Sequence, residues 1–163
     1  MDKPIKKLSL YLETSVWNFI YADDAPEKRD ATKLLFEEIK EGRYDIFISE
    51  HVLAEVSRTS DSRKKALLED LVQKYSPVLL PPSPDVENLT TAYLQAKVAS
   101  EKASTDLAHI AYAVAYQCDV IVSWNLKHIV RLKTKVAVNG INRQLGYREI
   151  EIIVPEEVIG YGS

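Results

Sequence analysis

The sequence of 163 residues contains little cysteine and glycine, and it lacks a long hydrophobic run. Cys118 is its only cysteine, which excludes an intramolecular disulfide and a zinc–thiolate cluster. Its five glycines follow no period, which excludes a collagen-like chain. No apolar run approaches the roughly 18 residues that a membrane helix needs, and no signal peptide is recognised at the N-terminus. We therefore expect a reduced, cytoplasmic protein that does not enter a membrane.

The overall composition is that of a folded protein. Apolar residues make up 46% of the chain and charged residues 28%, with a formal net charge of −3. A disordered chain would have fewer aliphatic residues and a larger net charge. A chain of this length buries about two thirds of its unfolded surface when it folds. We therefore expect a single domain over residues 1–163.

Segments with strand patterns alternate along the chain with segments of helical periodicity. Strands are predicted at 8–12, 44–48, 120–123 and 149–154, and the short apolar run 78–80 fits another. Helices are predicted from 13–15, from Pro26 to near Gly42, from Ser49, over 61–75, over 85–102 and from Ser104 or Thr105, with a loop at 81–84. This alternation predicts an α/β protein with a mostly parallel sheet covered on both faces.

Oxygen-bearing side chains fall where sites form in such sheets, beyond the carboxyl ends of the strands. Glu13 follows the first strand and Glu55 lies on the helix after the second. Asp106 opens the helix that leads to the strand at 120, and Asn125 follows that strand. Three carboxylates brought together repel one another unless a cation lies between them. Hard oxygen ligands suit Mg²⁺ or Mn²⁺.

The order of these motifs resembles a known family. Tyr-Leu-Glu-Thr-Ser at 11–15, Ser-Glu-His-Val-Leu-Ala-Glu-Val at 49–56 and Asp-Leu-Ala-His-Ile-Ala-Tyr-Ala at 106–113 are similar to motifs of PIN-domain proteins, which include the VapC-type toxins of toxin–antitoxin pairs. Asp-Val-Ile-Val-Ser-Trp-Asn at 119–125 is similar to a fourth motif, and the resemblance spans nearly the whole chain. It implies a three-layer α/β/α fold and a ribonuclease that depends on Mg²⁺ or Mn²⁺.

The same resemblance implies a role for each site residue. Glu13, Glu55 and Asp106 would be the metal-binding carboxylates, and Asn125 would stand where the family has Asp or Asn. Thr14 or Ser15 would orient the first carboxylate. The family most often has Asp at the first position, so Glu13 departs from its pattern by one methylene. We also expect an RNA substrate, an antitoxin protein as a partner and a homodimer.

Each of these residues has a structural alternative. Asp106 is also a first-turn carboxylate that favours its helix dipole, and Glu55 fits a solvated helix charge. Glu13 fits a residue that opens a helix, and Asn125 fits a helix cap. The three histidines share no spacing typical of a zinc site, and His109 is interpreted as a packed or hydrogen-bonded residue.

Basic residues gather after the strand at 120–123. From Val120 through Arg148 the sequence has no Asp or Glu, and this stretch includes Lys127 and Arg131. Such a segment favours a phosphate backbone beside the carboxylates, whereas its alternatives are a solvated face or a surface that binds an acidic protein. Trp124 is a candidate for stacking on a base, although core packing is the commoner role of tryptophan. Asp119, at the other end of its strand, is interpreted as structural.

Two other functions are weighed against the nuclease. The first is a catalytically weak or inactive PIN-like module that binds RNA or a protein partner. The second is a phospho-acceptor signalling domain, which is disfavoured because no acceptor Asp follows the strands at 44–48 and 78–80. The sequence also has no phosphate-binding G-x-x-x-x-G-K-[ST] loop and no G-x-S-x-G nucleophile motif.

Overall fold

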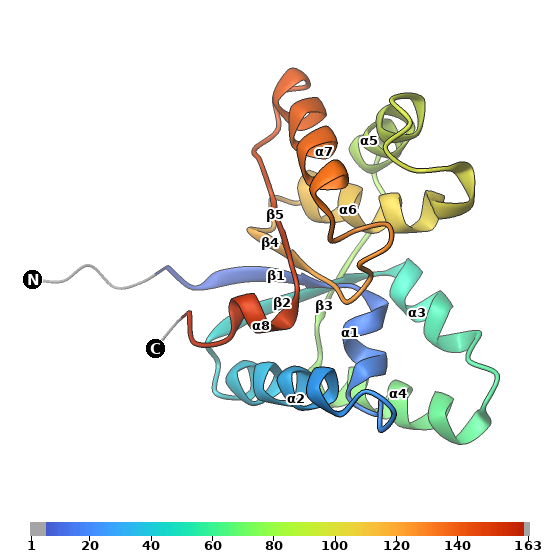
Figure 1. Cartoon of the computed structure of the whole chain (residues 1–163), viewed down its shortest axis with the longest axis vertical. Coiled ribbons are helices and arrows are strands. Elements are labelled where there is room, and N and C mark those ends of the chain that lie inside the picture. Colours follow the sequence, from blue (N-terminus) through green and yellow to red (C-terminus); the bar gives the residue numbers. More distant parts are fainter. Residues whose placement is uncertain (1–5, 162–163) are drawn as a thin grey trace, which may run out of the picture.

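The computed structural model describes residues 6–161 and contains a five-stranded sheet in which neighbouring strands are all parallel (Figure 1). The predicted single domain over 1–163 extends past these residues at both ends. The strands follow the order β3-β2-β1-β4-β5 across the sheet. Their bounds are Leu8–Leu12 for β1, Tyr44–Ser49 for β2, Val78–Leu80 for β3, Val120–Val122 for β4 and Glu151–Ile153 for β5.

Helices cover both faces of the sheet, which gives the predicted three-layer α/β/α arrangement (Figure 1). Three helices lie on one face: α5 (Pro84–Gln95), α6 (Ser104–Ala115) and α7 (Leu132–Gln144). On the other side lie α1 (Thr14–Phe19), α2 (Pro26–Lys40), α4 (Ser62–Tyr75) and the short α8 (Pro155–Val158), and α3 (Glu50–Ser57) packs against α1 and α4. Of the helices within 6–161, none has both the length and the apolar character that a membrane crossing requires.

The central strand β1 determines where a site can form. Leu10, Tyr11 and Leu12 of this strand are completely buried, because helices cover both faces of the sheet. Burying one such side chain contributes about 1.5–3 kcal/mol. The strand pairs with β2 on one side and with β4 on the other, so the chain order reverses at β1. Ligands bind to open parallel sheets in the crevice beyond the carboxyl ends of the strands at such a point.

Helix α6 supports the site from behind. Its residues from Leu107 through Val114 are all buried, so both sides of the helix pack into the protein. Asp106 and His109 lie one turn apart on this helix, and residues at that spacing share a face. The rigid packing of α6 therefore fixes both side chains relative to the end of β1.

The helix predicted over 85–102 is wrong beyond residue 95. Helix α5 ends at Gln95, and a short 3-10 helix, η1, follows at Glu101–Ala103. Lys97 takes a left-handed backbone with φ of 57°, its N–H donates to the Leu94 carbonyl, and the Val98 N–H donates to the Tyr93 carbonyl. These two bonds form a Schellman cap, which ends a helix. The last strand is also shorter than predicted, at Glu151–Ile153.

A candidate metal centre at the carboxyl edge of the sheet

Glu13 is anchored where β1 meets α1. Its backbone N–H donates to the Val122 carbonyl of β4 at 3.1 Å. Its Oε2 accepts from the Ser15 backbone N–H at 3.1 Å, which makes Glu13 the N-cap of α1. Its Oε1 accepts from the hydroxyls of Ser15 and Ser123, each at 2.6 Å. Glu13 is only 4% exposed. Glu13 therefore opens a helix, which is the structural role expected as an alternative from the sequence. It also presents a buried carboxylate at the sheet edge.

Glu55 reaches the same place from α3. Its Oε1 accepts from the Thr14 hydroxyl at 3.1 Å and lies 2.5 Å from His109 Nε2. Burial by itself raises the pKa of Glu55, but the hydrogen bond and charge of His109 and the bond from Thr14 outweigh it and lower the pKa overall. Ser15 therefore orients Glu13, whereas Thr14 orients Glu55.

A buried chain of hydrogen bonds supports Glu55. His109 Nδ1 lies 2.6 Å from the Tyr11 hydroxyl, which lies 2.7 Å from the Ser49 hydroxyl. The His109 tautomer sets the direction of these bonds: with Nε2 as the donor and Nδ1 as the acceptor, Ser49 donates to Tyr11, Tyr11 to His109, and His109 to Glu55. Tyr11, Ser49 and His109 are each completely buried. The interpretation of His109 as a hydrogen-bonded residue is confirmed, and its partner Glu55 is a feature that the sequence did not reveal.

The carboxylates of Glu13 and Glu55 come close together. One oxygen of each, together with one ring nitrogen of His109, all lie within 4.8 Å of one another. Asp106 is not part of this tight group, but it is near enough to sense its charge. Burial raises the pKa of Asp106, and the negative charges of Glu13 and Glu55 raise it further. The three predicted carboxylates thus share one electrostatic environment, in which the negative charge on Asp106 is disfavoured.

Asn125 uses its side chain to cap a turn. Its Oδ1 accepts from the His128 backbone N–H at 2.9 Å, which agrees with the capping role considered from the sequence. Its own backbone N–H donates to the Ser123 hydroxyl at 2.9 Å, and this hydroxyl donates to Glu13. The segment after β4 is therefore connected to Glu13 through Ser123, a residue that sequence reasoning missed.

The structure favours a packing role for Trp124. This residue is 6% exposed, and its indole N–H donates to the Thr32 hydroxyl at 2.8 Å. Its ring lies 5.7 Å from the ring of Phe19, and Lys28 Nζ lies 5.4 Å from its centre. These contacts leave little of the indole surface for stacking on a base.

The basic stretch divides into two parts. Lys127 and Arg131 line a hollow of about 540 Å³, which we call the basic hollow and whose other cationic side chains are Lys97 and Lys133. The Arg131 guanidinium also donates to the Thr134 hydroxyl at 3.1 Å, which fixes its position.

The later residues of this stretch lie elsewhere, so the expectation of one continuous basic segment at the site is wrong. Arg143 forms an ion pair with Glu149 at 2.7 Å, and Arg148 lies 3.8 Å from Asp119. Asp119 also accepts from the Ser9 backbone N–H at 2.9 Å. It ties the amino ends of β1 and β4 together, which confirms its structural role.

These features define a class: a parallel α/β/α protein with clustered carboxylates at the carboxyl edge of its central strands. A family model described as the PIN domain matches residues 10–129, and the chain belongs to the PIN domain family. Among solved structures, the chain is similar to one titled as VapBC2 from Rickettsia felis bound to a DNA fragment from their promoter. That match has a TM-score of 0.56 and 17% identity, and it covers 90% of this chain and 98% of the other. No curated protein sequence matches the chain.

Proposed function

We propose that the protein is a divalent-metal-dependent ribonuclease that hydrolyses RNA phosphodiesters. The observation that carries this proposal is the close approach of the Glu13 and Glu55 carboxylates beside His109. Asp106 lies near enough that, after burial, the charges of Glu13 and Glu55 also raise its pKa. Proteins seldom gather like charges in partly buried surroundings unless a cation or a proton compensates them. Membership of the PIN domain family supports the same reading.

The donor set fits Mg²⁺ or Mn²⁺. Carboxylate oxygens are the ligands that these hard cations prefer, and such sites often combine a few carboxylates with water and substrate phosphate. Glu13, Glu55 and Asp106 would hold the ion, while His109 Nε2 is already engaged by Glu55. A bound divalent ion lowers the pKa of a water molecule and stabilises charge on a phosphodiester.

The remaining residues position these groups. Ser15 and Ser123 hold the Glu13 carboxylate, and Thr14 and His109 hold Glu55, so neither side chain must reorganise during the reaction. Lys127 and Arg131 of the basic hollow would bind phosphates of the RNA backbone. Asn125 would act with the catalytic carboxylates, at the position where the family has Asp or Asn. No side-chain nucleophile is needed for hydrolysis of this kind.

We further propose that the protein is the toxin of a toxin–antitoxin pair. One solved structure with a similar fold is titled as VapBC2 bound to a DNA fragment from their promoter. On this proposal the partner is an antitoxin protein, the chain forms a homodimer, and the pair acts in the cytoplasm. Co-expression with the product of a small neighbouring reading frame tests the partner: a stable complex that suppresses RNA cleavage supports it, and independent purification of the two proteins refutes it.

The central experiment is cleavage of a labelled single-stranded RNA by the purified protein with Mg²⁺ or Mn²⁺. We expect cleavage by the wild type and at least a hundredfold loss in Asp106→Asn, because misplaced catalytic groups cost about that factor. Asp24→Asn, a change at an exposed loop residue, is the matched control and should cleave normally. Cleavage that survives Asp106→Asn would trace the activity to a contaminant and refute the proposal.

One observation favours a second function, a PIN-like module that binds RNA or protein without cleaving. Both oxygens of Glu13 already accept hydrogen bonds, so this carboxylate is satisfied as a helix cap without any metal ion. RNA binding by a wild type that cleaves no RNA with either metal ion would support this second function.

A further inference from the structure

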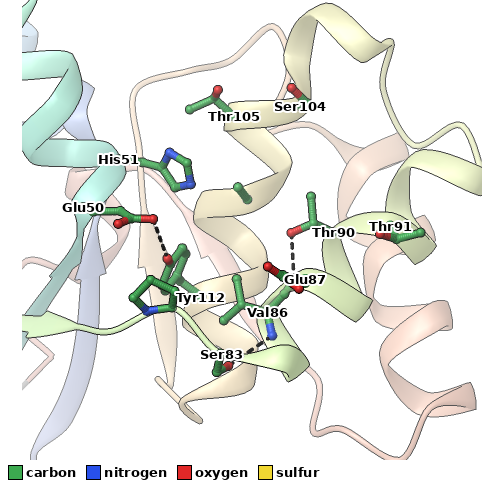
Figure 2. Close-up of a pocket in the computed structure, with 12 residues that line it drawn as sticks. Glu50, His51, Ser83, Val86, Glu87, Thr90, Thr91, Ser104, Thr105 and Tyr112 are labelled. Atoms are coloured by element: carbon green, nitrogen blue, oxygen red, sulfur yellow. Dashed lines mark hydrogen bonds between the residues drawn. The ribbon is translucent and has the colours of Figure 1, made fainter.

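A second pocket lies beside the carboxylate cluster. It has a volume of about 480 Å³ and opens between α3, α5 and α6 (Figure 2). His51 lines it, and the ring of His51 lies 5.8 Å from the ring of His109, which contacts Glu55. Thr105, the residue before Asp106, lines it as well. The pocket is therefore adjacent to the proposed metal centre, and the proposed function leaves it without a role.

The lining combines an apolar floor with acidic walls. Val86, Ala108 and Tyr112 contribute buried apolar surface, and each is less than 10% exposed. Glu50 and Glu87 approach the same space from α3 and α5 (Figure 2). The Glu50 carboxylate accepts from the Tyr112 hydroxyl at 3.2 Å, which fixes its direction. The lining includes no lysine or arginine, in contrast to the basic hollow.

This lining selects for a flat ligand that donates hydrogen bonds. An ionised carboxylate only accepts, so it pairs with N–H groups and repels phosphate. Among the four RNA bases, guanine alone carries two neighbouring donor groups, N1–H and the N2 amine, on its Watson–Crick edge. Its ring would cover the apolar floor, and Thr105 places a hydroxyl group in the lining that can donate to its O6. Unstacked bases in single-stranded RNA are read in this way.

We propose that this pocket binds a guanine base of the RNA substrate next to the phosphate that is cleaved. The inference rests on the proposed ribonuclease function and gives it a sequence preference. The cationic head group of a partner protein offers similar donors to Glu50 and Glu87, and the peptide experiment below distinguishes that occupant from guanine. The pocket is also adjacent to the metal centre, where a base flanking the cleaved bond must lie.

The test uses labelled single-stranded oligouridylates that carry one guest base: guanine, adenine, cytosine or hypoxanthine. We expect the wild type with Mn²⁺ to cleave beside guanine about tenfold faster or more than beside adenine, since hydrogen bonds to a charged acceptor contribute that factor. Hypoxanthine lacks the N2 amine and should give an intermediate rate. Glu87→Gln and Glu50→Gln should each reduce the preference for guanine, because an amide nitrogen replaces one acceptor oxygen.

Glu69→Gln, on exposed surface of α4, is the matched control and should keep the full preference. A second measurement avoids catalysis: titration of the metal-free protein with guanosine or adenosine monophosphate. We expect tighter binding of the guanosine nucleotide, and loss of this difference in Glu87→Gln. Discrimination between the nucleotides by a protein that cleaves no RNA would support the pocket and refute the ribonuclease.

Two results would overturn the inference while leaving the ribonuclease intact. The first is cleavage at equal rates beside every guest base, together with equal binding of both nucleotides. The second is base-independent cleavage that an arginine-rich peptide inhibits in the wild type but not in Glu87→Gln. This second result would assign the pocket to a cationic side chain of a protein partner.

Discussion

Replacing Asp106 by asparagine should separate the stability of the protein from its metal binding. Burial and the charges of Glu13 and Glu55 raise the pKa of Asp106, so ionising this carboxyl costs more in the folded state than in the unfolded chain. Asparagine has nearly the same shape without the charge. In metal-free buffer at pH 7, we therefore expect the variant to melt at the same temperature as the wild type or at a higher one.

With the metal ion bound, the wild type should instead melt at a higher temperature than Asp106→Asn. The Glu13 and Glu55 oxygens lie within 4.8 Å of each other, and two unit charges at that distance repel by about 3.5 kcal/mol at an effective dielectric constant of about 20. A cation between them relieves this repulsion. At a metal concentration about a hundred times the dissociation constant, binding stabilises the folded state by about 2.7 kcal/mol. For a domain of this size, 1 kcal/mol corresponds to about 2–4 °C, so the wild-type Tm should rise by about 5–11 °C.

The assay is a pair of thermal melts, with chelator and with millimolar Mn²⁺, for the wild type, Asp106→Asn and the control Asp24→Asn. The control should shift as much as the wild type because Asp24 is exposed and lies outside the cluster. Asp106→Asn should lose most of the shift. Equal shifts in all three proteins, or no shift in any, would refute the reasoning.

Other substitutions test the groups around the cluster. Glu13→Asp withdraws the carboxylate by roughly 1.5 Å and should lower RNA cleavage about a hundredfold, with a larger loss under Mg²⁺ than under Mn²⁺; a gain in cleavage would favour the binding module. His109→Gln should reduce both the Tm in chelator, by about 5–10 °C, and the metal-induced shift, whereas an unchanged shift would make His109 purely structural. Reversal of Lys127 and Arg131 to Glu should weaken RNA binding and flatten its salt dependence at nearly constant Tm. The pKa of Glu55 is lowered in the folded protein, which contributes stability above the usual pKa of a glutamate. This stability is lost as the pH falls through the lower, folded value. Between pH 7 and pH 3, the melting temperature of Glu55→Gln should therefore fall less than that of the wild type.

The sequence was sufficient to predict the central sheet because its strands carry strong signals. The segments 8–12 and 120–122 are apolar and short, and turn or cap residues bound them. The approach of Glu13 and Glu55 has a related reason. Carboxyl ends of neighbouring parallel strands meet at one edge, and Glu13 follows β1 directly while Glu55 lies on the helix that begins after β2. Asp106 lies on α6, before β4, so this rule does not place it.

Other features depend on contacts between distant segments, which a local pattern does not encode. The cap at Lys97 has no glycine, so nothing in the sequence marks the end of α5. The bond between His109 and Glu55 joins residues 54 positions apart, on two different helices. The basic stretch divides because α7 carries its later residues away from the sheet edge, toward Asp119 and Glu149. A count of charges along the chain contains no information about that direction.

The longer side chain at position 13 has a structural explanation. The Glu13 carboxylate bends back far enough for Oε2 to accept from the Ser15 backbone N–H, while Oε1 meets the hydroxyls of Ser15 and Ser123. An aspartate at the same backbone position would be one methylene too short to maintain this whole set of bonds. The surroundings therefore fit a glutamate at position 13, because the Ser123 hydroxyl after β4 donates a hydrogen bond to the longer side chain. The same bonds satisfy the carboxylate with or without a metal ion, so cleavage by Glu13→Asp is the measurement that separates the ribonuclease from the binding module.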